Sequence, residues 1–197
     1  KQVETYVNCP RRMLDSYQLI KKNVNSNIPV NMTYMGTDWG LCCNSIHFID
    51  IFMYLCNADS YELNLEEIIC EVIESKRLGY VELRGKEIIT TSKGDSLILG
   101  SYEHFDKSPA VSITNGNTEI TFNEITGELD INGILYTRPL KYQSTLSGIV
   151  IDELINTGKC KLTSYQDSAK YHKTFLKNIL PFINKLKGIE SDSCPIT

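Results

Sequence analysis

A short segment near residue 40 holds the side chains best suited to proton chemistry. It reads Trp39-Gly40-Leu41-Cys42-Cys43-Asn44-Ser45-Ile46-His47-Phe48-Ile49-Asp50. If the segment opens a helix, its polar members share one face, because positions three and four apart are neighbours on a helix; they are Cys43, Asn44, His47 and Asp50. A histidine titrates near neutral pH, so between an amide and a carboxylate it suits proton transfer. The same spacing also fits an ordinary His–Asp pair on a helix surface.

Other side chains could contact a ligand, and each has a structural alternative. The adjacent Arg11 and Arg12 could clamp a phosphate or carboxylate, or they could form the solvated start of a helix. Trp39 could stack on a sugar ring or simply pack. His104 lies beside turn residues, which indicates a solvated side chain, and His172 lies on an apolar stripe, which is typical of a core histidine.

The sequence lacks the common motifs for binding nucleotides or metals. It contains no GxGxxG or GxxxxGK[ST] segment, so it has no recognisable cradle for nucleotide phosphates. It also contains no GxSxG elbow and no HExxH helix. The seven cysteines are scattered and form no CxxC pair, so we predict no metal site and a reduced, cytoplasmic protein.

Composition and charge narrow the class of protein. The 197 residues are 42% hydrophobic and 22% charged, which is typical of a globular domain. The net charge of −4 argues against a nucleic-acid binder, which needs a basic face. No run approaches the roughly 18 apolar residues of a membrane span, so we expect no membrane partner.

Residue patterns predict an α+β fold with a large, mainly antiparallel sheet and helices packed on one face. Apolar spacings of three and four predict helices, and short β-rich runs with Asn-Gly turns predict antiparallel strands between residues 67 and 137. The expected helices span residues 10–25, 41–55, 144–156 and 164–187, and further strands span 5–9 and 30–34. The chain enters its first strand almost at Lys1, which indicates either a piece of a longer protein or a trimmed disordered tail.

These features together resemble the C-terminal domain of the Gfo/Idh/MocA oxidoreductases. In that family a helix has the pattern G-x-x-x-D-x-G-x-H-x-x-D, and its end matches Ser45-Ile46-His47-Phe48-Ile49-Asp50. The opening Tyr6-Val7-Asn8-Cys9-Pro10-Arg11-Arg12 is similar to the strand that leaves the family's Rossmann domain and the segment after it. The ending Cys194-Pro195-Ile196-Thr197 resembles the tails of members from bacterial surface-sugar pathways.

The resemblance implies a set of roles. Residues 1–197 would form one domain, the substrate-binding and oligomerisation domain of a longer parent whose N-terminal Rossmann domain is absent here. The parent would oxidise or reduce a sugar or sugar-nucleotide with NAD or NADP, and this chain alone would bind no cofactor. His47 would be catalytic and Asn8 would contact the cofactor. The substrate would be contacted by Arg12, Trp39, Asn44 and Asp50.

The resemblance also implies a homo-dimer or tetramer formed through the open face of the sheet. A sheet covered by helices on one side leaves its other face uncovered, and large exposed apolar patches usually mark interfaces. We predict that this face carries Val81, Leu83, Ile89 and Leu97.

Two departures from the family pattern bear on activity. Cys43 stands where the family has an acid, four residues before the histidine. The family's catalytic lysine belongs to a Glu-Lys-Pro segment of the Rossmann domain, and no such segment occurs here. We therefore expect this chain to be inactive alone. The alternative is a non-catalytic module for sugar binding or oligomerisation with the same fold.

Overall fold

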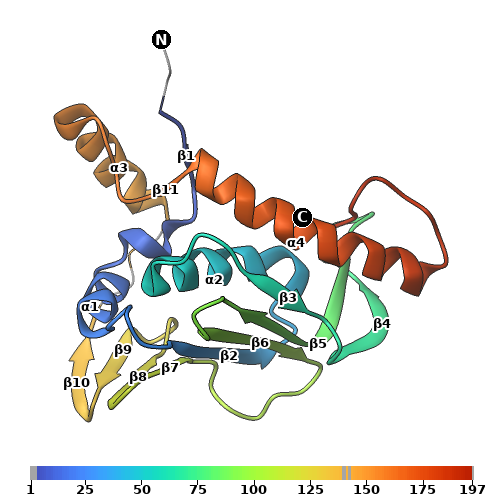
Figure 1. The fold of residues 1–197 in the computed structure, drawn as a ribbon, viewed down its shortest axis with the longest axis horizontal. Coiled ribbons are helices and arrows are strands. Elements are labelled where there is room, and N and C mark those ends of the chain that lie inside the picture. Colours follow the sequence, from blue (N-terminus) through green and yellow to red (C-terminus); the bar gives the residue numbers. More distant parts are fainter. Residues whose placement is uncertain (1–3, 139–140, 142, 197) are drawn as a thin grey trace.

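One large sheet forms the base of the molecule. The computed structural model describes residues 4–138, 141 and 143–196, and within them this sheet has nine strands (Figure 1). Its order is β10-β9-β8-β7-β2-β6-β5-β3, and β4 pairs with β5. The strands are β2 (Asn31–Thr37), β3 (Glu62–Asn64), β4 (Ile68–Glu74), β5 (Val81–Thr90), β6 (Ser96–Tyr102), β7 (Val111–Asn115), β8 (Thr118–Phe122), β9 (Glu128–Ile131) and β10 (Ile134–Thr137).

The helices gather on one side of this sheet. Helix α2 packs on β5 and β6, and α4 packs on α2 (Figure 1). A two-stranded pair, β1 (Tyr6–Val7) with β11 (Thr163–Ser164), lies beside the start of α4. The helices are η1 (Pro10–Met13), α1 (Asp15–Asn23), α2 (Leu41–Cys56), α3 (Gln143–Thr157) and α4 (Tyr165–Lys187). The predicted α+β class, with a mainly antiparallel sheet and helices on one face, is confirmed.

The sheet is not a simple meander, because β2 is inserted at its centre. β2 pairs parallel with β6, where Thr33 lies opposite Ile98, and antiparallel with β7, where Thr33 lies opposite Ser112. Asn-Gly turns predict hairpins between strands that follow each other, and the turn before β8 is such a case. They carry no information about a strand whose partner lies 65 residues away in the chain, as Thr33 lies from Ile98, so the central parallel pair was not predicted.

One local prediction was wrong. The expected helix over residues 10–25 is split at Leu14, whose backbone is extended, into η1 and α1. Strand β5 runs continuously through Arg84-Gly85. Gly85 has φ +114°, and a Cβ there would lie 2.5 Å from the Glu67 carbonyl oxygen, so this glycine serves the close approach of β4 rather than a turn.

The residues assigned to the open face of the sheet lie on the other face. Val81, Leu83, Ile89 and Leu97 are all buried and belong to the core beneath the helices. Alternation along a strand separates two faces but does not say which face the helices cover. The side chains of Thr33, Ile88 and Ile98, which are opposite one another in register, lie on the uncovered face and are partly exposed.

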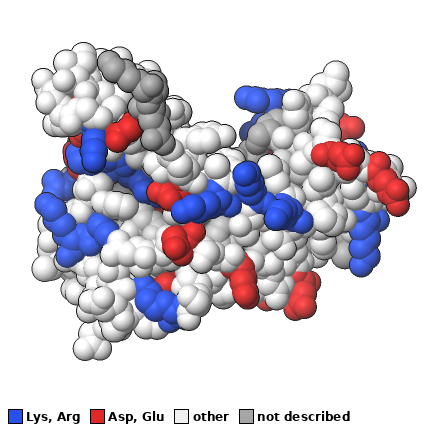
Figure 2. Space-filling model, turned by 45° about the horizontal axis from the view of Figure 1, so that its top comes forward, with Lys and Arg blue, Asp and Glu red and all other residues white. Residues whose placement is uncertain are grey.

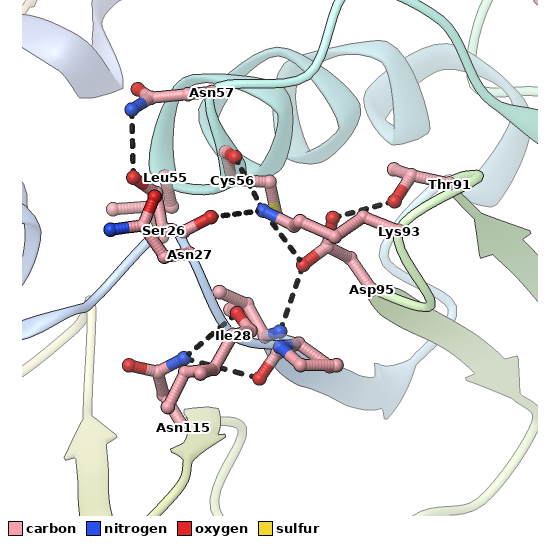
Figure 3. Close-up of polar contacts among 12 residues, drawn as sticks. Ser26, Asn27, Ile28, Leu55, Cys56, Asn57, Thr91, Lys93, Asp95 and Asn115 are labelled. Atoms are coloured by element: carbon pink, nitrogen blue, oxygen red, sulfur yellow. Dashed lines mark hydrogen bonds and ion pairs between the residues drawn. The ribbon is translucent and has the colours of Figure 1, made fainter.

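A buried polar cluster holds the C-terminal end of α2, whereas the histidine segment lies at the other end of this helix (Figure 3). The Asp95 carboxylate is fully buried; it accepts from the Val30 amide (2.9 Å) and the Thr91 hydroxyl (2.5 Å) and pairs with Lys93. Lys93 Nζ also donates to the carbonyl oxygen of Cys56, the last residue of α2, at 2.8 Å. The cluster therefore joins the end of α2 to the start of β2 and sets how the helix lies on the sheet.

A second buried carboxyl group, Glu87, lies under α2 and has no such partners. In the described ranges no hydrogen bond of good geometry reaches either oxygen, because the nearby Ser45 hydroxyl donates to the Leu41 carbonyl oxygen. Burial raises the pKa of Glu87 to about 8; the Ser45 hydroxyl opposes the rise, and the charge of Glu82 adds to it. The carboxyl therefore stays protonated in the folded protein at neutral pH, while in the unfolded chain it titrates near 4.5.

We predict that Glu87→Leu stabilises the protein increasingly as the pH rises. Between about pH 4.5 and about pH 8 the folded protein keeps a proton on Glu87 that the unfolded chain releases. The free energy of unfolding therefore falls by up to about 1.4 kcal/mol per pH unit because of this group. Below about pH 4.5 both states are protonated and the contribution is constant. Urea unfolding across this interval measures the difference between variant and wild type. The exposed Glu119→Leu serves as the control, and parallel pH profiles for wild type and Glu87→Leu would contradict the assignment.

Candidate active site

The histidine segment begins α2, and a tight backbone turn positions it. Gly40 precedes the helix with φ +80°, and a Cβ there would lie 2.9 Å from Cys43 Sγ, so the position requires glycine. The Glu82 carboxylate then accepts a hydrogen bond from the Cys42 amide at 2.7 Å. A carboxylate at a helix N-terminus satisfies an unpaired N–H group and complements the helix dipole. Glu82, from β5, thereby fixes the start of α2 against the sheet.

The predicted polar face of α2 is present, and its residues differ in what they contact. Asn44 Nδ2 donates to the carbonyl oxygens of Trp39 (2.8 Å) and Gly40 (3.1 Å), so this amide holds the entry turn in place. Trp39 Nε1 donates to the Gly100 carbonyl oxygen at 2.7 Å, and its ring packs edge-on against Tyr34 and Phe48. The side chains of Trp39 and Asn44 are half-buried. Both stabilise the fold through these contacts, in addition to any contact with a substrate.

His47 is half-buried one helical turn after Cys43. Burial, and next the positive charge of Arg11, lower the pKa of His47 below its ordinary value, so the ring is neutral at pH 7. Its Nδ1 atom is buried and hydrogen-bonds to no group among the described residues. His47 is therefore a neutral ring at pH 7, which can exchange a proton with an oxygen atom of a ligand.

Asp50 lies one turn further along α2, but its carboxylate is committed to Arg12. Arg12 Nε donates to Oδ2 at 2.8 Å and Nη2 donates to Oδ1 at 2.9 Å, a bidentate pair. The Thr163 hydroxyl also donates to Oδ1. Asp50 is 1% exposed. The pair therefore joins η1, α2 and β11. Among the described residues, the side chains that donate to the Asp50 carboxylate are those of Arg12 and Thr163 rather than His47.

Arg11 forms a second bidentate pair, with Glu124 at 2.7 and 2.8 Å. The Tyr17 hydroxyl donates to the same carboxylate at 2.8 Å. The Arg11 guanidinium lies 4.0 Å above the centre of the Phe48 ring, next to His47 in the chain. No local pattern pointed to Glu124 as the partner of Arg11, because 113 residues separate the two and Glu124 lies in a turn between strands.

The predicted site residues line separate hollows in the surface. Trp39, Cys43 and Asn44 line a cavity of about 480 Å³, which Glu82 and Arg84 also line. Arg12 lines another of about 610 Å³, beside the start of α4. Asn8 is exposed in a smaller groove of about 190 Å³ next to α3. His47 lies on α2 between the residues of the first two hollows and lines neither of them. Its catalytic role, and the binding roles of the others, stay predictions.

Two further observations concern metals and membranes. No three His, Cys, Asp or Glu side chains gather as a possible metal site within the described ranges. Of the helices in that part of the chain, none is both long enough and apolar enough to cross a membrane.

Comparison with solved structures defines the class of fold. It is the fold of oxidoreductases and dehydrogenases of the Gfo/Idh/MocA type, as the resemblance implied. No protein-family model matches the sequence, and no curated protein matches it. The sequence identities to the solved structures are 16% or lower, so the likeness concerns the fold.

Three solved structures illustrate the likeness. UDP-N-acetylglucosamine 3-dehydrogenase GnnA from Acidithiobacillus ferrooxidans superposes with a TM-score of 0.64 at 9% identity, covering 88% of this chain and 59% of that chain. An oxidoreductase from Thermotoga maritima gives 0.61 at 15%, covering 86% and 58%. Aldose-aldose oxidoreductase from Caulobacter crescentus gives 0.57 at 13%, covering 94% and 62%. The chain thus spans about three fifths of the length of these proteins.

We predict that His47 titrates below 6.5, the ordinary value for a histidine, because burial and Arg11 both disfavour its charged form. The chain has three histidines, so an NMR titration of the ring signals resolves each one, and His104→Asn and His172→Asn assign the remaining signals. Arg11→Gln should raise the His47 midpoint, since a nearby positive charge is lost. A wild-type midpoint at or above 6.5 would contradict the described surroundings.

Proposed function

We propose that this chain is the substrate-side domain of an NAD(P)-dependent sugar or sugar-nucleotide oxidoreductase and is inactive alone. The observation that carries the proposal is His47 itself: a neutral, half-buried histidine near the start of α2, in a fold shared with sugar oxidoreductases. Oxidation of a sugar hydroxyl releases a proton from oxygen and a hydride from carbon. A neutral imidazole can accept or return that proton, which is the role we assign to His47.

The substrate class follows from the cavity at the start of α2 and from the neighbouring proteins. Two of those proteins are named for UDP-N-acetylglucosamine and aldose chemistry. The cavity beside Trp39 and Asn44 offers an aromatic edge and polar groups, which suit a sugar ring. We assign sugar contact to Trp39 and Asn44, and we keep Arg12 and Asp50 as a pair that shapes the substrate side of α2.

The residues of this chain do not fit the phosphates of a dinucleotide. The sequence lacks a glycine-rich phosphate loop. The N-terminus of α2 is capped by the Glu82 carboxylate, and that of α4 by Ser164 with Asp167 in its first turn. Acidic groups at these positions repel a pyrophosphate. We therefore propose that a separate nucleotide-binding domain holds the cofactor. Of the residues of this chain, we assign contact with the cofactor to Asn8 alone.

The domain organisation is part of the proposal. Solved proteins with this fold are longer, since this chain covers 58–62% of the three compared above. We infer that residues 1–197 form one domain of a longer protein and that a Rossmann domain precedes it. We also propose a cytoplasmic location, in line with the scattered spacing of the seven cysteines, which form no CxxC pair.

The test is turnover by the longer protein, produced from the complete reading frame. Sugar nucleotides and free aldoses with NAD or NADP should give turnover, and His47→Ala should lower it by about 10²–10⁴-fold while leaving thermal stability unchanged. Cys43→Asp is the companion variant, because it restores the acid of the family pattern. A gain in turnover would show that the reaction still benefits from this acid, and unchanged turnover would show that another group has taken its role. Unchanged turnover in His47→Ala would remove the catalytic assignment.

A non-catalytic module is the second candidate, and two observations favour it. Cys43 replaces the acid of the family pattern, and both arginines of the entry segment are occupied by carboxylates. Sugar binding by the 197-residue chain, measured by calorimetry, together with no turnover by the longer protein would support this reading.

We also propose a homo-dimer or tetramer through the uncovered sheet face. Ile88 and Ile98 lie opposite each other at its centre, beside Thr33 of β2. Ile98→Glu should convert the oligomer to a monomer in light scattering, because a charge in a buried interface is costly. Ile125→Glu, on an exposed turn, is the matched control. A wild type that stays monomeric at high concentration would contradict this proposal.

A further inference from the structure

Glu82 differs from the other acids of the cavity at the start of α2. On the face of the molecule in Figure 2, acidic and basic side chains lie side by side. Asp38, which lines the cavity, is such a case, since it forms a bidentate pair with Arg84 at 2.8 and 2.9 Å. Glu74, which also lines it, is exposed at the end of β4. Glu82 is 7% exposed, so it alone of the three is both enclosed and without a cationic partner in the described ranges.

The two carboxylate oxygen atoms of Glu82 differ in what they contact. Oε2 accepts a hydrogen bond from the Cys42 amide at 2.7 Å, which holds the start of α2. Oε1 accepts none of the hydrogen bonds found in the described ranges, yet it is not sealed in the core as the oxygens of Glu87 are. Oε1 therefore borders the cavity, where a ligand can reach it.

Two further polar groups lie beside Oε1 at the entry turn. A Cβ on Gly40 would lie 2.9 Å from Cys43 Sγ and 3.0 Å from Asn44 Nδ2. The same point lies 3.4 Å from Glu82 Oε1. Oε1 and the side chains of residues 43 and 44 therefore surround one position at the cavity wall. His47 follows Cys43 by one helical turn, about 6 Å along the helix axis, so a ligand held at Oε1 can extend toward His47 along the polar face of α2.

The chemistry of a carboxylate limits what can bind at this position. The N-terminus of α2 favours negative charge on Glu82, whose Oε2 accepts from the first turn of the helix. An ionised carboxylate accepts hydrogen bonds and donates none, so its partner at Oε1 is a hydroxyl or amide group and not a phosphate oxygen. Trp39 lines the same cavity and offers an aromatic surface to an apolar face. A sugar ring supplies both hydroxyl groups and such a face.

We propose that Glu82 is a substrate-binding residue whose Oε1 accepts a hydrogen bond from a hydroxyl group of the sugar. This inference rests on the proposed function, which takes the ligand of the cavity to be a sugar. Glu82 belongs to β5, on which α2 packs. In this chain the strand beneath the helix thereby supplies the carboxylate that the family pattern places on the helix itself, where Cys43 stands.

Turnover by the longer protein, with free aldoses and sugar nucleotides as substrates, tests the assignment. Glu82→Gln keeps an oxygen atom for the Cys42 amide but removes the charge and the second acceptor. It should lower kcat/KM by at least about tenfold, mainly through a higher KM, because a hydrogen bond to the bound sugar is lost. Adding Cys43→Asp to Glu82→Gln should restore most of that loss, because the double variant returns a carboxylate to position 43. Glu74→Gln, which changes an exposed acid of the same cavity, is the matched control and should leave kcat/KM unchanged.

A merely structural role for Glu82 gives a different set of results. If Glu82 only holds the start of α2, Cys43→Asp does not rescue Glu82→Gln, and that outcome would overturn the assignment. Unchanged kcat/KM in Glu82→Gln, or an equal loss in Glu74→Gln, would also overturn it. Turnover that depends on His47 but not on Glu82 removes this inference alone, whereas a wild-type longer protein without turnover removes the proposed function as well.

Discussion

The bidentate pair between Arg12 and Asp50 is the interaction on which the arrangement of the helical side depends. It joins three segments that are distant in sequence: η1, the middle of α2 and β11, through Thr163. Removing one partner from a buried ion pair leaves an uncompensated charge and typically costs about 3–5 kcal/mol. The same pair fixes where the chain enters the domain, because β11 pairs with β1. The position of the entry strand relative to the middle of α2 therefore depends on one carboxylate.

The neighbouring arginine has a different effect, although both belong to one short segment. Arg11 is held by Glu124, to which Tyr17 also donates, and its guanidinium lies over Phe48 of α2. Burial first, and then the positive charge of Arg11, lower the pKa of His47. A neutral histidine at pH 7 can exchange a proton with a hydroxyl group, whereas a permanently charged one could not accept it. Arg12 thus places the helix, and Arg11 tunes the residue that we assign to chemistry.

The sequence predicted the features that depend on nearby residues. Helical spacing predicted the bounds of α2 and α4 to within a residue or two. Features that depend on distant residues were not predicted: β2 at the centre of the sheet, the pairing of Arg11 with Glu124, and the face on which Leu83 and Leu97 lie. Local patterns limit what a segment can form, but its partners are chosen by the packing of the whole chain.

Glu82 shows why the missing acid at position 43 need not leave the start of α2 without negative charge. A Cβ on Gly40 would lie 2.9 Å from Cys43 Sγ and 3.4 Å from Glu82 Oε1, so the thiol and the carboxylate flank the same turn. The Glu82 carboxylate is also buried and bound to the Cys42 amide. Two carboxylates in such a space cannot both ionise easily, because each raises the pKa of the other. An aspartate at position 43 would therefore compete with Glu82 for the N-terminus of α2. The uncharged Cys43 thiol fits beside the Glu82 carboxylate without that competition.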